Sequence, residues 1–148
     1  MKEKKTIDIV ELFSNVLGDK INEFDLPPQS FTVMQADIID FDVQSKSLIT
    51  KMPVLASWSN PYGSMQGGMI NAAIDNAVGP LSLLIAPFNM TRTMQTKYIK
   101  PITLDLKTIY VHARLQEEKK KRLTFDVLVM DACETVYTKS TVVNWIVE

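Results

Sequence analysis

The sequence of 148 residues contains a single cysteine, Cys133, and a single histidine, His112. A lone cysteine cannot form an internal disulfide, which fits a reducing compartment, and we interpret Cys133 as a small turn residue. One histidine leaves a multi-histidine zinc site, a histidine-based triad and a dyad with Cys133 all unsupported. We therefore predict no metal site and a structural or surface role for His112.

The sequence also lacks an excess of charge of either sign, with a formal net charge of -1. No global basic field is available for nucleic acid, so we expect no nucleic-acid partner. Asp8 and Glu11 interrupt any hydrophobic region of an export signal, and we expect a cytoplasmic protein. The longest apolar stretch, residues 69–90, contains Asp75 and Pro80 and indicates a buried helix plus a loop instead of a membrane span.

The length predicts one domain, 1–148, that buries roughly 70% of its unfolded surface. Apolar residues at helical spacing predict an amphipathic helix over 7–17 that ends at Gly18. The following segment contains two adjacent prolines and indicates an irregular connection. We therefore divide the domain into an N-terminal helix and linker, 1–29, and a core, 30–148.

Strand patterns occupy most of the core. They predict a hairpin of strands 31–43 and 47–54, then a helix, then strands 92–99, 104–116, 123–130 and 135–147. A shift in apolar parity predicts a bulge near Lys107 and Thr108, and the short connections predict antiparallel neighbours. The expected fold class is α+β, with one curved antiparallel sheet around a long central helix and an extra N-terminal helix.

The predicted central helix contains one ionisable side chain, Asp75, in an apolar run over 69–85. Because apolar residues occupy every face, we expect the helix to be buried and Asp75 with it. A buried charge without partners costs roughly several kcal/mol. Asp75 is therefore either a satisfied structural aspartate or an active-site base.

The segment before this helix is Asn60-Pro61-Tyr62-Gly63-Ser64-Met65-Gln66-Gly67-Gly68. Gly67 and Gly68 stand where the helix begins, and the first N–H groups of a helix are unpaired and carry positive partial charge. The start of the helix is therefore a predicted binding site for an oxyanion. Glycine has no side chain there, so a bulky ligand can approach the backbone closely. Taken alone, Asn60 to Gly63 is a turn signal.

The pattern Asn-Pro-x-Gly-x-x-[His/Gln]-Gly-Gly, with an acid eight residues after the first glycine of the pair, resembles the hot-dog fold acyl-CoA thioesterases. The resemblance is to the phenylacetyl-CoA thioesterase-like branch in particular, and it covers roughly residues 30–148. It implies that Asp75 is the catalytic carboxylate, that the Gly67 amide polarises the thioester carbonyl, and that Asn60 orients substrate or water. It implies no cofactor.

Two further residues follow from the resemblance. The family's usual histidine is Gln66 here, which can donate and accept hydrogen bonds but cannot titrate. We expect Gln66 to orient the thioester. The family's hydroxyl residue, which holds the attacking water, corresponds to Thr91, with Thr93 as the alternative.

Eight residues along a helix rise roughly 12 Å, too far for Gly67 and Asp75 to touch one carbonyl. We therefore predict a homodimer with two shared active sites across a two-fold axis. The resemblance also implies dimers or tetramers. Asn71, four residues before Asp75, shares its helix face and is expected to support the carboxylate or to be a plain buried amide.

A basic run over 119–122 is either a solvated hairpin turn or a contact for the phosphates of coenzyme A. The candidate contacts are Lys119, Lys120, Lys121 and Arg122, and the glycine pair adds Gly68 to the substrate-binding set.

These features predict hydrolysis of acyl-CoA thioesters, with Asp75 either activating water or attacking directly. The alternative is a non-catalytic hot-dog module that binds acyl-CoA or a lipid-like ligand, because Gln66 replaces the histidine. A dehydratase on the same fold would require that histidine.

Overall fold

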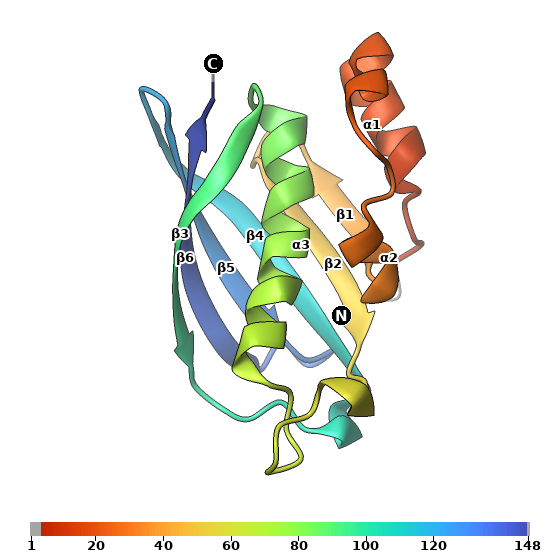
Figure 1. The fold of residues 1–148 in the computed structure, drawn as a ribbon, viewed down its shortest axis with the longest axis vertical. Helices are drawn as coiled ribbons and strands as arrows, with labels where there is room; N and C mark the ends of the chain where they lie inside the picture. The colour runs from red at the N-terminus through yellow and green to blue at the C-terminus, as the bar shows by residue number, and fades with distance from the viewer. Residues whose placement is uncertain (1–3, 148) are drawn as a thin grey trace.

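A six-stranded antiparallel sheet curves around one long helix, α3, in the computed structural model, which describes residues 4–147 (Figure 1). The strand order is β1-β2-β4-β5-β6-β3. The elements in chain order are α1 (Ile9–Leu17), η1 (Gly18–Glu23), α2 (Gln29–Val33), β1 (Asp37–Asp42), β2 (Ser47–Pro53), η2 (Ala56–Trp58), α3 (Gly67–Ile85), β3 (Asn89–Tyr98), η3 (Leu104–Leu106), β4 (Thr108–Lys119), β5 (Arg122–Met130) and β6 (Val136–Ile146). The predicted α+β architecture is confirmed.

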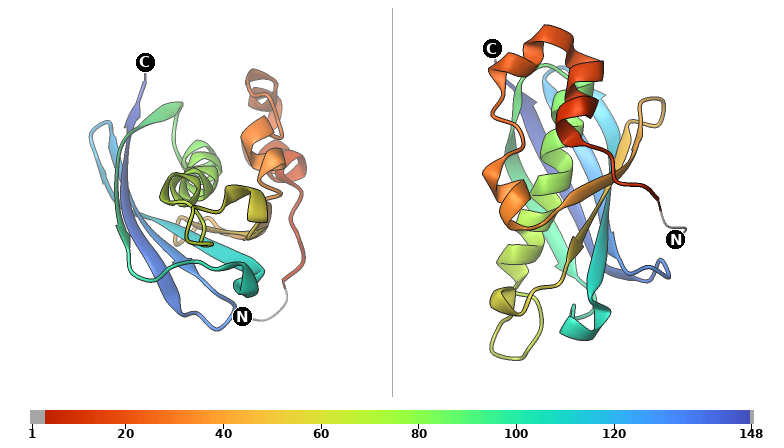
Figure 2. Two further views of the ribbon diagram at one scale, coloured as in Figure 1. Left: turned by 60° about the horizontal axis from the view of Figure 1, so that its bottom comes forward. Right: turned by 90° about the vertical axis from the view of Figure 1, so that its right-hand side faces the viewer.

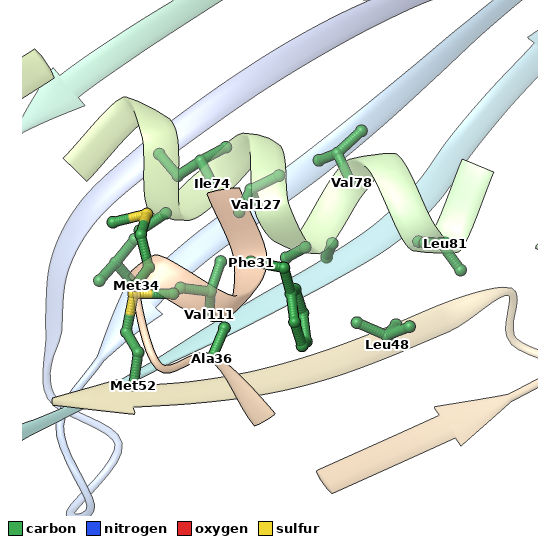
Figure 3. Close-up of a cluster of buried hydrophobic side chains, with 14 of the residues drawn as sticks. Phe31, Met34, Ala36, Leu48, Met52, Ile74, Val78, Leu81, Val111 and Val127 are labelled. Carbon is green, nitrogen blue, oxygen red and sulfur yellow. The ribbon is translucent and has the colours of Figure 1, made fainter. Parts of the chain in front are cut away.

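The core lies between α3 and the concave face of the sheet. Ala73 and Ala77 on α3 are completely buried, and such small side chains let a helix approach a sheet closely. Ile74, Val78 and Leu81 are larger side chains of the same helix, and they fill the space between α3 and the strands, as Figure 3 shows. By length and mean hydropathy alone, α3 could cross a membrane, but half of it is buried in this fold, and we interpret it as the core helix.

The N-terminal segment packs beside α3 on the side of β1 and β2 (Figure 2). Asp8 caps α1 by accepting a hydrogen bond from the Glu11 N–H at 2.8 Å, and Gly18 ends it with a φ of 59°. Phe13 is 1% exposed and belongs to the same buried cluster as the sheet. The predicted amphipathic helix is therefore present, although more helical structure follows it than the sequence indicated.

The prediction of a strand from Phe31 is wrong, because residues 29–33 form the short helix α2 and β1 begins at Asp37. Phe31 and Met34 are both buried, whereas Val33 is 66% exposed. A spacing of three between buried residues is that of a helix, and this short apolar run does not distinguish it from a strand.

The prediction that a strand starts at Leu104 is also wrong. Residues 104–106 form the 3-10 turn η3, and Lys107 follows it with a φ of 62° before β4 begins at Thr108. The change in apolar parity marks this turn and not a bulge. The irregularity of β4 lies between Leu115 and Glu117 instead.

The chain order of the strands does not give their neighbours, since β3 pairs with β6 and not with β4. The segment 99–107 crosses the end of the sheet to reach β4. Within residues 4–147, the other edge of β3 consequently has no partner strand along its ten residues, and most of these residues are exposed. The predicted ranges agree with β2, β5 and β6 to about one residue, whereas β3 begins at Asn89, three residues before its predicted start at Arg92.

Cys133 is exposed in the turn between β5 and β6, where Asp131 accepts hydrogen bonds from the Cys133 and Thr135 N–H groups at 2.9 Å each. His112 is half-buried on β4, on the face of the sheet turned away from α3. Burial is the main cause that lowers the pKa of His112. The surroundings of both residues fit the structural roles predicted for them.

Candidate functional site

Asn60 closes the loop that leads into α3. Its side-chain Oδ1 accepts hydrogen bonds from the Tyr62 N–H at 3.0 Å and the Ser64 N–H at 3.1 Å, and its Nδ2 donates to the Ser64 Oγ at 2.9 Å. The Asn60 N–H also donates to the Ser64 carbonyl at 2.7 Å. An asparagine side chain that accepts hydrogen bonds from the backbone N–H groups two and four residues later in the chain is typical of a turn. Asn60 therefore organises the loop, and its predicted contact with substrate stays a prediction.

The first amides of α3 are free to bind a ligand. The Gln66 carbonyl accepts hydrogen bonds from the Met69 and Ile70 N–H groups at 2.9 and 3.0 Å. Within residues 4–147, no hydrogen bond uses the N–H of Gly67 or Gly68. These two donors lie at the positive end of the helix dipole, as an oxyanion site requires. The Gln66 side chain is exposed beside them and makes no cap to the helix.

Tyr98, at the end of β3, fixes the position of Gly67, and sequence reasoning missed it. Its hydroxyl donates to the Gly67 carbonyl at 3.0 Å. A Cβ atom on Gly67 would lie 3.1 Å from both the Cζ and the Oη of Tyr98. This close contact gives a reason for glycine at position 67, and the partner lies 31 residues away, so no local motif signals it.

Asp75 is exposed in the single chain, so the prediction that it is buried is wrong. It lies on the side of α3 next to the start of β3, and with Gly79 it lines a cavity between α3 and the N-terminal segment. Apolar residues around a helix do not determine which face the rest of the protein covers.

Thr91, near the start of β3, donates a hydrogen bond from its hydroxyl to the Asp75 Oδ1 at 3.0 Å. The alternative, Thr93, has no hydrogen bond to Asp75 in the described part of the chain. The geometry therefore brings together the carboxylate and the first of the two threonines that the sequence left open.

Asn71 does not contact Asp75 through a hydrogen bond. Its Oδ1 accepts from the Thr96 hydroxyl at 2.7 Å, and that hydroxyl lies 2.9 Å from the Ser140 Oγ. Asn71 thus ties α3 to β3 and β6, and the expectation that it supports the carboxylate directly is not met in this chain.

Two separate cavities adjoin these groups. One, of about 330 Å³, is lined by Asn60, Gly67 and Tyr98 among others. The other, of about 240 Å³, is lined by Asp75 and Thr91. Because the two groups are eight residues apart on one continuous helix, a single chain holds the halves of the predicted site roughly 12 Å apart.

The basic run forms the tip of the β4–β5 hairpin, and it lines a third cavity of about 370 Å³ with the exposed Trp145. Arg122 and Glu117 form an ion pair at 3.4 Å, whereas Lys119 and Lys120 have no ion pair among the described residues. Trp145 pairs with Met90, the neighbour of Thr91 on β3. Side chains alternate along a strand, so this basic cavity and Thr91 lie on opposite faces at the same end of the sheet.

No protein-family model matches the sequence, and a comparison with curated proteins found no match. Solved structures do match. A protein of Ralstonia eutropha JMP134, described as a candidate thioesterase related to phenylacetic acid degradation, has a TM-score of 0.77 and 17% identity over 91% of this chain and 98% of its own. The E. coli PaaI protein, from the phenylacetic acid degradation operon, has a TM-score of 0.76 and 14% identity over 95% and 96%.

A Streptococcus mutans protein solved with acetyl-CoA is also similar, with a TM-score of 0.69 and 21% identity over 76% of this chain and 88% of its own. At these identities the likeness concerns the fold. The chain has the hot-dog fold, in the form found in structures described as thioesterases.

Replacing Asn60 with alanine removes the three side-chain hydrogen bonds that close the loop. We expect the amide hydrogens of Tyr62 and Ser64 to exchange at least about fivefold faster, since each loses a hydrogen bond that contributes roughly 1 kcal/mol. Tyr62→Ala, at a side chain that is 93% exposed, is the control and should leave the exchange of Ser64 unchanged. Equal exchange in the Asn60→Ala and wild-type proteins would contradict the loop-closing role.

Proposed function

We propose that this protein hydrolyses acyl thioesters of coenzyme A to the free acid and the thiol. The observation that carries the proposal is the hydrogen bond from Thr91 on β3 to Asp75, because Asp75 lies on the same helix, α3, whose first two amides are free. A carboxylate that holds water and a pair of backbone donors are the two components that cleavage of a thioester needs.

In the proposed reaction, the N–H of Gly67 binds the carbonyl oxygen and stabilises the negative charge that develops on it. One such donor contributes roughly 3 to 4 kcal/mol to a tetrahedral transition state. Asp75 either takes a proton from water as the water adds to the carbonyl carbon, or adds to that carbon itself. The carbon–sulfur bond then breaks, and the thiolate leaves and takes up a proton. If Asp75 has added to the carbon itself, the acyl group is left on Asp75 as an anhydride, which water then hydrolyses to the free acid and the Asp75 carboxylate.

Thr91 holds the attacking water or fixes the orientation of Asp75, because its hydroxyl donates to the carboxylate. Gln66, exposed beside the free amides, orients the thioester through neutral hydrogen bonds. Asn60 acts through the loop that it closes. Gly68 supplies a second donor and room for the ligand.

A homodimer would bring the two half-sites together. The free edge of β3 can pair with a second copy of itself, and unpaired edges favour such pairing. Antiparallel pairing about a two-fold axis places the start of one β3 beside the end of the other. Thr91 is near the start, in contact with Asp75, and Tyr98 is at the end, in contact with Gly67. The pairing therefore moves Asp75 of one protomer toward Gly67 of its partner.

The alternative is a non-catalytic module that binds acyl-CoA or a lipid-like ligand. It is favoured by one observation, the neutral Gln66 at the place where the resemblance implies histidine. Such a module would bind acyl-CoA without turnover.

Release of thiol from a panel of short, medium, long and aromatic acyl-CoAs tests the enzyme. Asp75→Asn should lower kcat by about 100-fold or more, since general base catalysis contributes roughly 10² to 10⁴. Asparagine keeps the acceptor for the Thr91 hydroxyl, so the fold should be unchanged. Thr93→Val is the matched control and should retain activity. No turnover of any thioester by the wild-type protein would reject the enzyme and leave the binding module.

The shared site predicts recovery of activity from two inactive parents. When Asn60→Ala and Asp75→Asn proteins are unfolded together and refolded, about half of the dimers are heterodimers. Each heterodimer has one site with both changes and one intact site, so activity should return to about a quarter of the wild type. A mixture as inactive as its parents, with subunit exchange confirmed by mass spectrometry, would show that the site lies within one protomer.

The proposed contact of the basic turn with the phosphates predicts an effect on binding. Lys119→Ser combined with Lys120→Ser should raise KM for acyl-CoA by about tenfold, which corresponds to about 1.4 kcal/mol, with little change in kcat. Added salt should reproduce the effect because it screens exposed charges. The control, Lys5→Ser combined with Lys20→Ser, removes the same charge elsewhere. An unchanged KM would make the turn an ordinary solvated one.

A further inference from the structure

The cavity beside Asp75 and Thr91 has apolar walls that come from two distant parts of the chain. Ile9, Phe13 and Leu26 of the N-terminal segment form one wall, and Gly79 on α3 faces them. The cavity therefore lies between the segment before the hot-dog core and the helix that carries the candidate carboxylate. Its volume is about 240 Å³, below the roughly 300 to 1,000 Å³ of pockets for drug-sized ligands.

Gly79 precedes Pro80 within α3, where a residue with a Cβ atom is disfavoured in helical conformation by contact with the proline ring. Its missing side chain also leaves space on the surface of the helix. A Cβ atom built on Gly79 has no other atom within 4 Å, apart from its neighbours in the helix. This contrasts with Gly67, whose Cβ would meet Tyr98 at 3.1 Å. The open space at Gly79 belongs to the cavity.

The wall on the N-terminal side is held in place next to Asp75. Asn76, the following residue, accepts a hydrogen bond from the Ser30 hydroxyl at 3.1 Å and donates to the Ser30 carbonyl at 3.3 Å. Its Nδ2 also lies 3.1 Å from the Met34 sulfur. The N-terminal segment is thus attached to α3 at the residue beside the candidate carboxylate.

We infer that this cavity receives the acyl group of the thioester, and that Phe13, Leu26 and Gly79 limit the length of the chain it accepts. The inference rests on the proposed function, because it takes Asp75 and Thr91 as the point at which the carbonyl lies. The volume and the apolar walls fit a short apolar acyl group. The N-terminal segment is then part of the substrate site and determines specificity.

Gly79→Leu tests the inference, since it adds a side chain to the cavity at a position with room for it. Acetyl-CoA should be hydrolysed within about twofold of the wild-type rate, whereas kcat/KM for hexanoyl-CoA should fall by tenfold or more, because one methylene in a pocket changes rates by roughly 10- to 200-fold. Phe13→Ala should have the opposite effect and extend the range to longer chains. Asn15→Leu, on the exposed face of α1, is the control and should leave the chain-length profile unchanged.

Gly79→Ala adds a smaller group at the same position. It should lower kcat/KM for hexanoyl-CoA by less than Gly79→Leu does, and it should again leave acetyl-CoA unaffected. An equal fall for all chain lengths, or an unchanged profile, would overturn the inference.

S-hexyl-CoA, a thioether that cannot be hydrolysed, separates this inference from the proposed function. Selective loss of its affinity in Gly79→Leu, with the affinity of S-ethyl-CoA unchanged, supports the cavity even for a protein without turnover. Equal affinities of the wild type and the variant for S-hexyl-CoA would reject the cavity even if the thioesterase activity is demonstrated.

Discussion

The structure depends on one element, the helix α3, which is continuous from Gly67 past Asp75. Its completely buried residues hold it against the sheet, so the two candidate groups that it carries keep a fixed separation. Eight residues fix the free amides of Gly67 and the carboxylate of Asp75 roughly 12 Å apart. No adjustment of side chains closes that distance, and a site that uses both groups requires a second chain.

In the proposed homodimer, the strand β3 is the element that relates one α3 helix to the other. Its two ends touch the two separated groups, through Thr91 to Asp75 and through Tyr98 to Gly67. Asn71 and Thr96 join its middle to α3. The two candidate half-sites therefore lie at opposite ends of the free edge of β3. If a second copy pairs along this edge with two-fold symmetry, each half-site lies beside the other half-site of the partner.

Much of the fold could be predicted from the sequence, because along most of the chain the spacing of apolar residues and the positions of turn residues indicate the same elements. The sequence does not distinguish strand from helix or turn at Phe31 and Leu104, because a short apolar run has no defined period at the end of an element. It does not show that Asp75 is exposed, because composition does not tell which face of a helix is covered. It carries no signal for Tyr98, because the contact of Tyr98 with Gly67 depends on the sheet topology, with β3 beside β6.

The unpaired edge of β3 also has a consequence for how activity would depend on concentration. If each site is completed by two chains, the fraction of complete sites falls as the protein is diluted toward the dissociation constant of the dimer. A substrate that touches both chains binds the dimer but not the separated protomers, so its binding free energy is added to that of association. Substrate would then promote assembly of the enzyme that consumes it, and the rate would rise more steeply than in proportion to the concentration of dilute protein.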